Sequence, residues 1–286
     1  MILETRVASA TKEVVIGHDR PTVLIGERIN PTGKKRLADA LRAGDLEVVR
    51  EEARAQVAAG ADILDVNVGA TGVDEVVMLP LAVQAVAETV DVPLCLDSRN
   101  VSALRAALEV CPGRAIVNSV TGEEASLDAI LPLVKEFGVA VIGLTLDDAG
   151  IPAEAEGRVA IAHRIVERAT ALGIPLEDVI IDCLTLALGA NGKAGLATLE
   201  AVRRVKAELG VNQTQGASNI SHGLPNRAPL NGAYLAMAID AGLTCPTVDV
   251  AQVRTAVLSA DLVLGRDDYA MRFIAAYRQA SGAALG

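Results

Sequence analysis

Aromatic residues are scarce in this 286-residue chain, which contains no Trp, three Tyr and two Phe. Proteins that bind single-stranded nucleic acid stack the bases on exposed aromatic rings, so this composition argues against such binding. Basic residues are also outnumbered, with 26 Lys and Arg against 36 Asp and Glu, and the formal net charge is −10. A surface this negative repels phosphate backbones. We therefore expect no nucleic-acid partner.

Long apolar runs are missing as well. No stretch approaches the roughly 18 residues that a membrane-spanning helix requires. The first residues, MILETRVASATKEVV, contain early charges and lack the apolar core of a signal peptide. We expect a cytoplasmic protein without a membrane partner.

Motifs for metal binding and covalent catalysis are absent too. The four cysteines lie far apart and form no CxxC pair, which is typical of reduced core cysteines. The three histidines show no HxH or HExxH spacing, so we expect no metal to be bound directly. The chain has no phosphate-binding glycine loop and no GxSxG elbow. No lysine lies at the end of a predicted strand, which argues against Schiff-base chemistry.

Short β-rich segments alternate with segments that carry apolar residues at helical spacing. The hydrophobic fraction is 51%, mostly Ala, Val, Leu and Ile. Strands are predicted at 23–29, 63–68, 94–99, 115–120, 140–146, 179–184, 214–220 and 247–250. The segments between them that read as helices include 46–59, 75–90, 102–110, 155–172, 197–209, 230–241 and 252–264. Strands that are apolar on both faces and separated by helices are typical of a parallel sheet.

The count of eight strands predicts an α/β fold closed as a (β/α)8 TIM barrel, which typically needs about 250 residues. The seventh strand has the weakest signal, because Gln, Gly, Ser and Asn dominate it. No linker or low-complexity stretch divides the chain, so we interpret 1–286 as one domain. Within it, 1–20 is expected to form an N-terminal extension on the barrel and 266–286 a terminal helix.

Polar residues stand at the ends of nearly all the predicted strands, where a buried sheet should be apolar. Burying a carboxylate or amide without a partner costs several kcal/mol, and the carboxyl ends of barrel strands are where binding groups gather. Taken singly, Asp65, Asp147 and Asp249 can be structural. The strand-end set as a whole predicts a site for a polar ligand at the barrel mouth. It comprises Glu27, Asn30, Asp65, Asn67, Asp97, Ser98, Asn118, Ser119, Asp182, Ser218, Asn219 and Asp249.

The set favours a flat heterocycle as the ligand. Carboxylates accept hydrogen bonds from amino and ring N–H groups, while carboxamides both donate and accept. A pterin presents an edge of this kind, and the missing phosphate and metal motifs remove other common ligands.

The chain also resembles a known family. The segments IGERIN, LDVNVG, LCLDS, NSV, IGLTLDDAGIP, IDCL and SNISHGLPNR occur in this order. They closely resemble the methyltetrahydrofolate:corrinoid methyltransferases, which include acetogen and anaerobic O-demethylase enzymes and the folate module of cobalamin-dependent methionine synthase. The similarity extends from about residue 23 to the C-terminal helix, and the combination is more specific than any one segment.

The resemblance implies a site for tetrahydrofolate or 5-methyltetrahydrofolate as substrate. Asp97, Asn118 and Asp182 match the residues that hold the pterin ring, and Asn219 matches the asparagine near N5, which is expected to act in catalysis. Four further residues are expected to complete the site: Asn30, Asn67, Ser218 and Arg227.

The resemblance further implies methyl transfer to or from a corrinoid (cobalamin). Corrinoid modules carry a DxHxxG motif whose His ligates cobalt, and none of the three histidines here has Asp two positions before it. The cofactor is therefore expected on a separate corrinoid-binding protein, and the family is commonly homodimeric. His222 stands where the family usually has Gln, in the loop expected to face the corrinoid.

Two alternatives stay open. Dihydropteroate synthase shares the pterin barrel, but it needs a GGESTRPG-type loop after the second strand and basic residues near the seventh, where this chain has NVGATGVDE and SNISHGLP. A non-catalytic folate-binding subunit of a demethylase complex would keep Asp97, Asn118 and Asp182 but need not keep Asn219.

Overall fold

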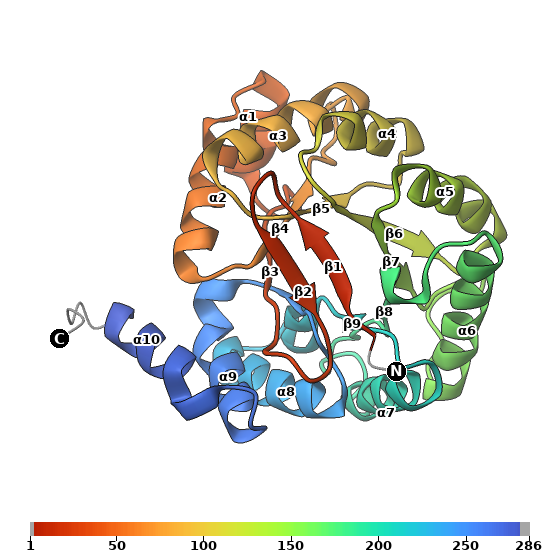
Figure 1. The fold of residues 1–286 in the computed structure, drawn as a ribbon, viewed down its shortest axis with the longest axis vertical. Coiled ribbons are helices and arrows are strands. Elements are labelled where there is room, and N and C mark those ends of the chain that lie inside the picture. Colours follow the sequence, from red (N-terminus) through yellow and green to blue (C-terminus); the bar gives the residue numbers. More distant parts are fainter. Residues whose placement is uncertain (1–2, 281–286) are drawn as a thin grey trace.

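The computed structural model describes residues 3–280 and shows a ring of parallel strands enclosed by helices (Figure 1). The strands are β3 (Ile25–Ile29), β4 (Ile63–Asn67), β5 (Leu94–Asp97), β6 (Ile116–Thr121), β7 (Ala140–Leu144), β8 (Val179–Asp182), β9 (Gln213–Thr214) and β10 (Thr247–Val248). They pair in the order β10-β3-β4-β5-β6-β7-β8-β9, and a parallel bridge between Gly216 and Thr247 joins the two end strands. The predicted (β/α)8 barrel is confirmed.

The helices follow the strands and form the outer ring of Figure 1. They are α1 (Lys35–Ala43), α2 (Glu47–Ala59), α3 (Glu75–Thr89), α4 (Val101–Val110), α5 (Glu124–Phe137), α6 (Ala155–Ala171), α7 (Ala194–Leu209), α8 (Arg227–Ala241), α9 (Val250–Val263) and α10 (Met271–Ala280). Glycines in the left-handed conformation end α2 and α5, at Gly60 and Gly138. Such residues return the chain sharply toward the next strand.

An antiparallel hairpin of β1 (Thr5–Ala8) and β2 (Glu13–Ile16) closes one end of the barrel. In Figure 1 it lies across the middle of the ring. Ala8 exchanges both backbone hydrogen bonds with Arg114, which precedes β6, so the hairpin sits at the N-terminal ends of the strands. The expected N-terminal extension over 1–20 contains this hairpin, and residues 1 and 2 lie outside the described part.

The interior of the barrel is apolar near the hairpin. Its apolar layer is formed by Val7, Val14, Ile16, Val23, Ile25, Ile63, Cys95, Ile116, Ala140, Ile142, Ile180 and Cys245. A second apolar layer packs the helices against the outside of the strands. All four cysteines are free thiols, and three of them are buried, as expected for core cysteines.

Three sequence-based boundaries need correction. The strand predicted over 214–220 ends at Thr214, and a 3-10 helix, η2 (Ala217–Ser221), follows it. The eighth strand ends at Val248, because Asp249 is the N-cap of α9. The terminal helix predicted over 266–286 begins only at Met271, after the short 3-10 helix η3 (Asp268–Ala270). Residues 281–286 lie outside the described residues.

Candidate active site at the mouth of the barrel

The polar strand ends converge because side chains alternate between the two faces of a strand. Ile25, Ile63, Cys95, Ile116 and Ile180 belong to the inner apolar layer. The residue two positions later on each strand therefore also points into the barrel, one layer closer to the mouth. These second residues are Glu27, Asp65, Asp97, Asn118 and Asp182. The open end of the barrel is thus lined by Glu27, Asp97, Asn118 and Asp182, while Asp65, which pairs with Cys95 across β4 and β5, lies deeper.

Asp97 is held by its neighbour Asn67. The two residues pair across β4 and β5, and the Asn67 Nδ2 donates to the Asp97 Oδ2 at 2.9 Å. The other end of the Asn67 amide accepts from the Gly69 backbone N–H at 2.8 Å. Burial raises the pKa of Asp97, and the hydrogen bond from Asn67 opposes this rise. One carboxylate oxygen of Asp97 thus has a fixed donor.

Asp65 lies deeper, beneath Asn118. Its side chain is 3% exposed, and the Asn118 Nδ2 donates to the Asp65 Oδ1 at 3.1 Å. Burial raises the pKa of Asp65 well above its usual range, and the nearby charge of Asp97 raises it further. Asp65 therefore orients Asn118, and its burial favours the protonated, neutral form of its carboxyl group.

Asp182 at the end of β8 is also buried. Its Oδ1 accepts from the Leu184 backbone N–H at 2.6 Å. Burial raises the pKa of Asp182 to about 7, although the N–H groups of Leu184 and Gly216 and the charge of Arg158 lower it. Since Asp182 titrates near neutral pH, its charge can respond to a bound ligand.

The helix η2 brings Ser218 to Glu27. The Ser218 hydroxyl lies 3.1 and 3.2 Å from the two Glu27 carboxylate oxygens. Burial raises the pKa of Glu27. Asn219, the next residue, is exposed, and its amide lies against Gly216.

Arg227 supports η2 from the start of α8. Its Nε donates to the Ser221 hydroxyl at 2.8 Å and its Nη2 donates to the Ser218 carbonyl oxygen at 2.7 Å. These contacts make Arg227 a brace for the segment that carries Ser218 and Asn219. His222, at the end of η2, is exposed.

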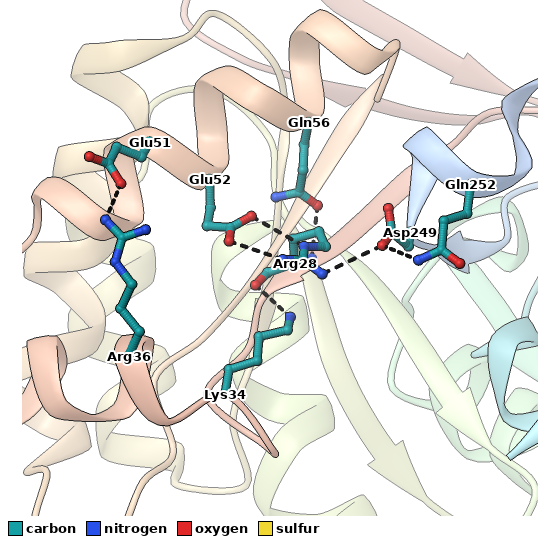
Figure 2. A network of polar contacts seen from close by, with 8 residues as sticks. All are labelled: Arg28, Lys34, Arg36, Glu51, Glu52, Gln56, Asp249 and Gln252. Carbon is teal, nitrogen blue, oxygen red and sulfur yellow. Dashed lines mark hydrogen bonds and ion pairs between the residues drawn. The ribbon is translucent and has the colours of Figure 1, made fainter. Parts of the chain in front are cut away.

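Asn30 fixes the loop after β3, because its Oδ1 accepts from the Thr32 backbone N–H at 3.0 Å. Nearby, Arg28 points outward from β3 into a network of polar contacts (Figure 2). The guanidinium pairs with Glu52 of α2 at 3.2 Å and with Asp249 at 3.5 Å. Asp249 thus serves a structural ion pair at the base of α9.

The same network explains why position 26 is occupied by a glycine. The Gln56 Oε1 accepts from the Arg28 backbone N–H at 2.8 Å. A Cβ at Gly26 would come within 2.5 Å of that oxygen. Figure 2 also shows Lys34 donating to the Arg28 carbonyl oxygen, at 2.8 Å. The contact with Gln56 thus holds the end of β3 against α2, and Lys34 holds it from the loop before α1.

A cavity of about 170 Å3 opens beside Glu27 and Ser218, and its lining includes Lys34 and Asn231. A larger cavity, of about 850 Å3, lies near the N-terminal hairpin and includes Arg20 and Arg272. It shares no residue with the strand ends described above, so we assign the chemistry to the mouth.

Within residues 3–280, no group of three or more His, Cys, Asp and Glu side chains is arranged to hold a metal ion. No helix described there is both long and apolar enough to cross a membrane.

The sequence-predicted residues therefore divide into two groups. Asp97, Asn118 and Asp182 point into the mouth and Asn219 lies at its rim, whereas four residues form hydrogen bonds to neighbouring groups of the protein: Asn30, Asn67, Ser218 and Arg227. Sequence reasoning left Glu27 and Asp65 without an assigned role. The signal that could have found them is their position two residues after a buried isoleucine.

The open end of this barrel carries inward-facing carboxylates and amides, the hydrogen-bond acceptors and donors that suit a flat polar heterocycle. Residues 26–249 match the family described as pterin binding enzyme. The chain belongs to this pterin-binding family.

Two relatives with similar sequences are methyltransferases or contain a similar region. The methylcorrinoid:tetrahydrofolate methyltransferase of Eubacterium limosum is 31% identical over 267 residues, covering 90% of this chain and 96% of that protein. The methionine synthase of Mycobacterium tuberculosis is 32% identical over 263 residues, covering 87% of this chain but only 22% of the longer protein.

Solved structures of dihydropteroate synthase share the fold. That of Xanthomonas albilineans superposes with a TM-score of 0.70 at 20% identity, covering 91% of this chain and 98% of that one. That of Yersinia pestis gives 0.69 at 17% identity, with the same coverage.

Proposed function

We propose that this protein transfers a methyl group between N5 of tetrahydrofolate and the cobalt of a corrinoid carried by a separate protein. The observation that carries the proposal is the inward-facing set Asp97, Asn118 and Asp182 at the barrel mouth. It is supported by the similarity to the Eubacterium limosum methylcorrinoid:tetrahydrofolate methyltransferase along nearly the full length of both chains.

The donor and acceptor pattern of these side chains suits a pterin edge. Ionised Asp97 and Asp182 accept from the amino and ring N–H groups, and Asn118 both donates and accepts. Asn67 fixes Asp97, and Asp65 fixes Asn118. Both groups are therefore oriented before the ligand arrives. Prior orientation lowers the entropy lost on binding.

Methyl transfer breaks the bond between N5 and the methyl carbon and forms a carbon–cobalt bond with the electron pair of Co(I). N5 keeps the electron pair of the broken bond and needs a proton. We expect the Asn219 amide to hydrogen-bond N5 as its charge changes, but a carboxamide supplies no proton. Glu27, which Ser218 links to the segment carrying Asn219, is a half-buried acid with a raised pKa and is our proposed proton source.

The proposed partners are the corrinoid-binding protein, docking over the mouth, and a second copy of this chain. His222 lies exposed on the segment that borders the mouth, where it can contact a docked protein. Sedimentation velocity of the purified chain measures its association with a second copy directly. A monomer at micromolar concentration would contradict a homodimer.

A single-turnover assay tests the activity. The enzyme and 5-methyltetrahydrofolate are mixed anaerobically with free cobalamin in the Co(I) state, and formation of methylcobalamin is followed by absorbance. Asp97→Ala should weaken folate binding by about 1–3 kcal/mol, because a ligand donor loses its acceptor. Folate binding with no transfer to any corrinoid acceptor would instead indicate a non-catalytic folate-binding subunit. Condensation of p-aminobenzoate with a dihydropterin diphosphate would indicate the synthase.

A further inference from the structure

Arg158 of α6 is a buried cation close to the proposed site. Its side chain is fully buried. An arginine is expensive to bury unless its donors are satisfied, so its surroundings must supply acceptors. Nε and Nη1 find acceptors in three different parts of the chain, two of which border the barrel mouth, whereas the buried Nη2 has no hydrogen-bond partner among the described residues.

The guanidinium joins the loops that follow β7 and β8. Its Nε donates to the carbonyl oxygen of Pro152 at 2.8 Å. Its Nη1 donates to the carbonyl oxygens of Cys183 at 3.1 Å and Leu184 at 3.0 Å, and contacts the Thr198 hydroxyl of α7 at 2.8 Å. The planar fork of arginine suits such a set of diverging acceptors.

Leu184 connects this cation to Asp182. Its φ angle is 56°, in the left-handed region that costs a bulky residue energy. Its N–H donates to the Asp182 carboxylate at 2.6 Å, while its carbonyl oxygen accepts from Arg158 and, at 3.3 Å, from the Thr198 hydroxyl. The residue is thus held in its strained conformation from both sides.

We propose that Arg158 is a positioning residue for ligand binding, which holds Leu184 and thereby orients the Asp182 carboxylate toward the mouth. The proposal rests on the proposed binding of a pterin by Asp182. Arg158 acts through Leu184 and through its charge, and it does not itself touch the ligand.

The charge of Arg158 also lowers the pKa of Asp182. Tyr234 of α8, Cys183 and Cys245 face Asp182 as well, and burial raises the pKa of each of them. These three groups stay neutral near pH 7. Arg158 is therefore the charged group that stabilises the ionised form of Asp182 within the described chain. Its removal should raise the pKa of Asp182 beyond about 7.

Two substitutions separate position from charge. Arg158→Met removes both the charge and the hydrogen bonds. Arg158→Lys keeps the charge but cannot reach all the acceptors of the planar fork. In ligand-free protein, the side-chain carboxyl carbon of Asp182 is titrated by NMR, with Asp182→Asn to assign its signal. We expect the Asp182 pKa to rise by about one or more in Arg158→Met and to stay near its normal value in Arg158→Lys.

Folate binding gives the second readout. Calorimetry with 5-methyltetrahydrofolate between pH 6 and 9 should show affinity losses of about tenfold or more for Arg158→Met and a smaller loss for Arg158→Lys. The pH midpoint of binding should move upward only in the methionine variant. The control is Arg164→Met, on the same helix, which removes an exposed guanidinium that pairs with Asp147. It should leave both readouts unchanged.

The proposal is overturned if folded Arg158→Met shows the normal Asp182 titration. Should that variant not fold, Arg158→Lys with undiminished folate affinity overturns it. If the unmodified protein binds no folate, the proposed function fails. The titration of Asp182 in ligand-free protein then still decides the role of Arg158.

Discussion

The amide of Asn118 on β6 donates to the carboxyl of Asp65 on β4 at 3.1 Å, across the intervening strand β5. Asp65 is too deep to meet a ligand at the mouth, so its contribution to binding passes through Asn118. The pair resembles the one formed by Asn67 and Asp97 one layer above. Each group that faces the mouth thus has a partner that fixes its orientation.

This relationship predicts different outcomes for two substitutions of Asp65. Asp65→Asn keeps an oxygen that accepts from Asn118, and it should change folate affinity less than threefold. Asp65→Val leaves the Asn118 amide unpaired, which should weaken folate binding by about 1–3 kcal/mol. Calorimetry on both variants measures the difference. Equal affinities for the two would show that Asn118 needs no partner at this position.

A second prediction concerns pH and Asp182. Its pKa is raised from 3.8 to about 7, so its protonated form favours the folded state. This stabilisation is complete below the unfolded pKa and is lost as pH rises through about 7. The loss amounts to an order of 4 kcal/mol, at about 1.4 kcal/mol for each pH unit. Asp182→Asn removes the titrating group.

The measurement is the free energy of unfolding of both proteins in ligand-free form from about pH 4 to 8. We expect the stability of Asp182→Asn relative to the unmodified protein to increase steadily over this window. A difference that stays constant with pH would mean that Asp182 keeps an ordinary pKa in the folded protein.

A third prediction separates binding from chemistry at Asn219. If its amide contacts N5 mainly as charge develops there, its loss should slow the chemical step more than it weakens ground-state binding. Asn219→Ala should slow single-turnover transfer by a factor of about 10²–10³, or about 3–4 kcal/mol. Poor folate binding with a normal saturated rate would make Asn219 only a pterin contact.

His222→Ala provides the matched comparison on the same segment. It should slow transfer to the corrinoid protein more than transfer to free cobalamin, because His222 is expected to face the docked partner. The opposite ranking of the two acceptors would move His222 from the docking surface to the reacting centre.

A fourth prediction concerns metals. No metal-ligand cluster occurs among the described residues, so folate binding should survive exhaustive treatment with a chelator. Calorimetry before and after chelation checks this. Loss of binding that zinc restores would contradict this prediction and would reveal a metal site that is not evident among the described residues.

Much of the barrel could be predicted because most of its strands are short apolar segments that can be recognised without knowledge of the rest of the chain. Leu94 to Leu96 and Val179 to Ile181 are continuously apolar, as expected for strands covered on both sides. The polar residues that follow them mark the mouth. Asp97, Asn118 and Asp182 could be found this way because each directly ends such a run.

Other features depend on partners distant in sequence. The segment after Thr214 turns into η2, because its pairing with β10 ends at a single bridge and Ser218 instead meets Glu27. Arg158 sits in a helix of ordinary appearance, and its burial depends on loops that contribute acceptors from Pro152 and Leu184. No local pattern marks such a residue.

The hairpin of β1 and β2 has a kinetic consequence. Since the hairpin and the packed apolar layer next to it close the far end of the barrel, a ligand held by Asp97 and Asp182 could enter and leave only through the mouth. A corrinoid protein seated over that opening would trap the folate beneath it. Exchange of folate would then have to alternate with docking of the partner. The enzyme should accordingly show an obligatory order of release, in which the protein substrate departs before the small one.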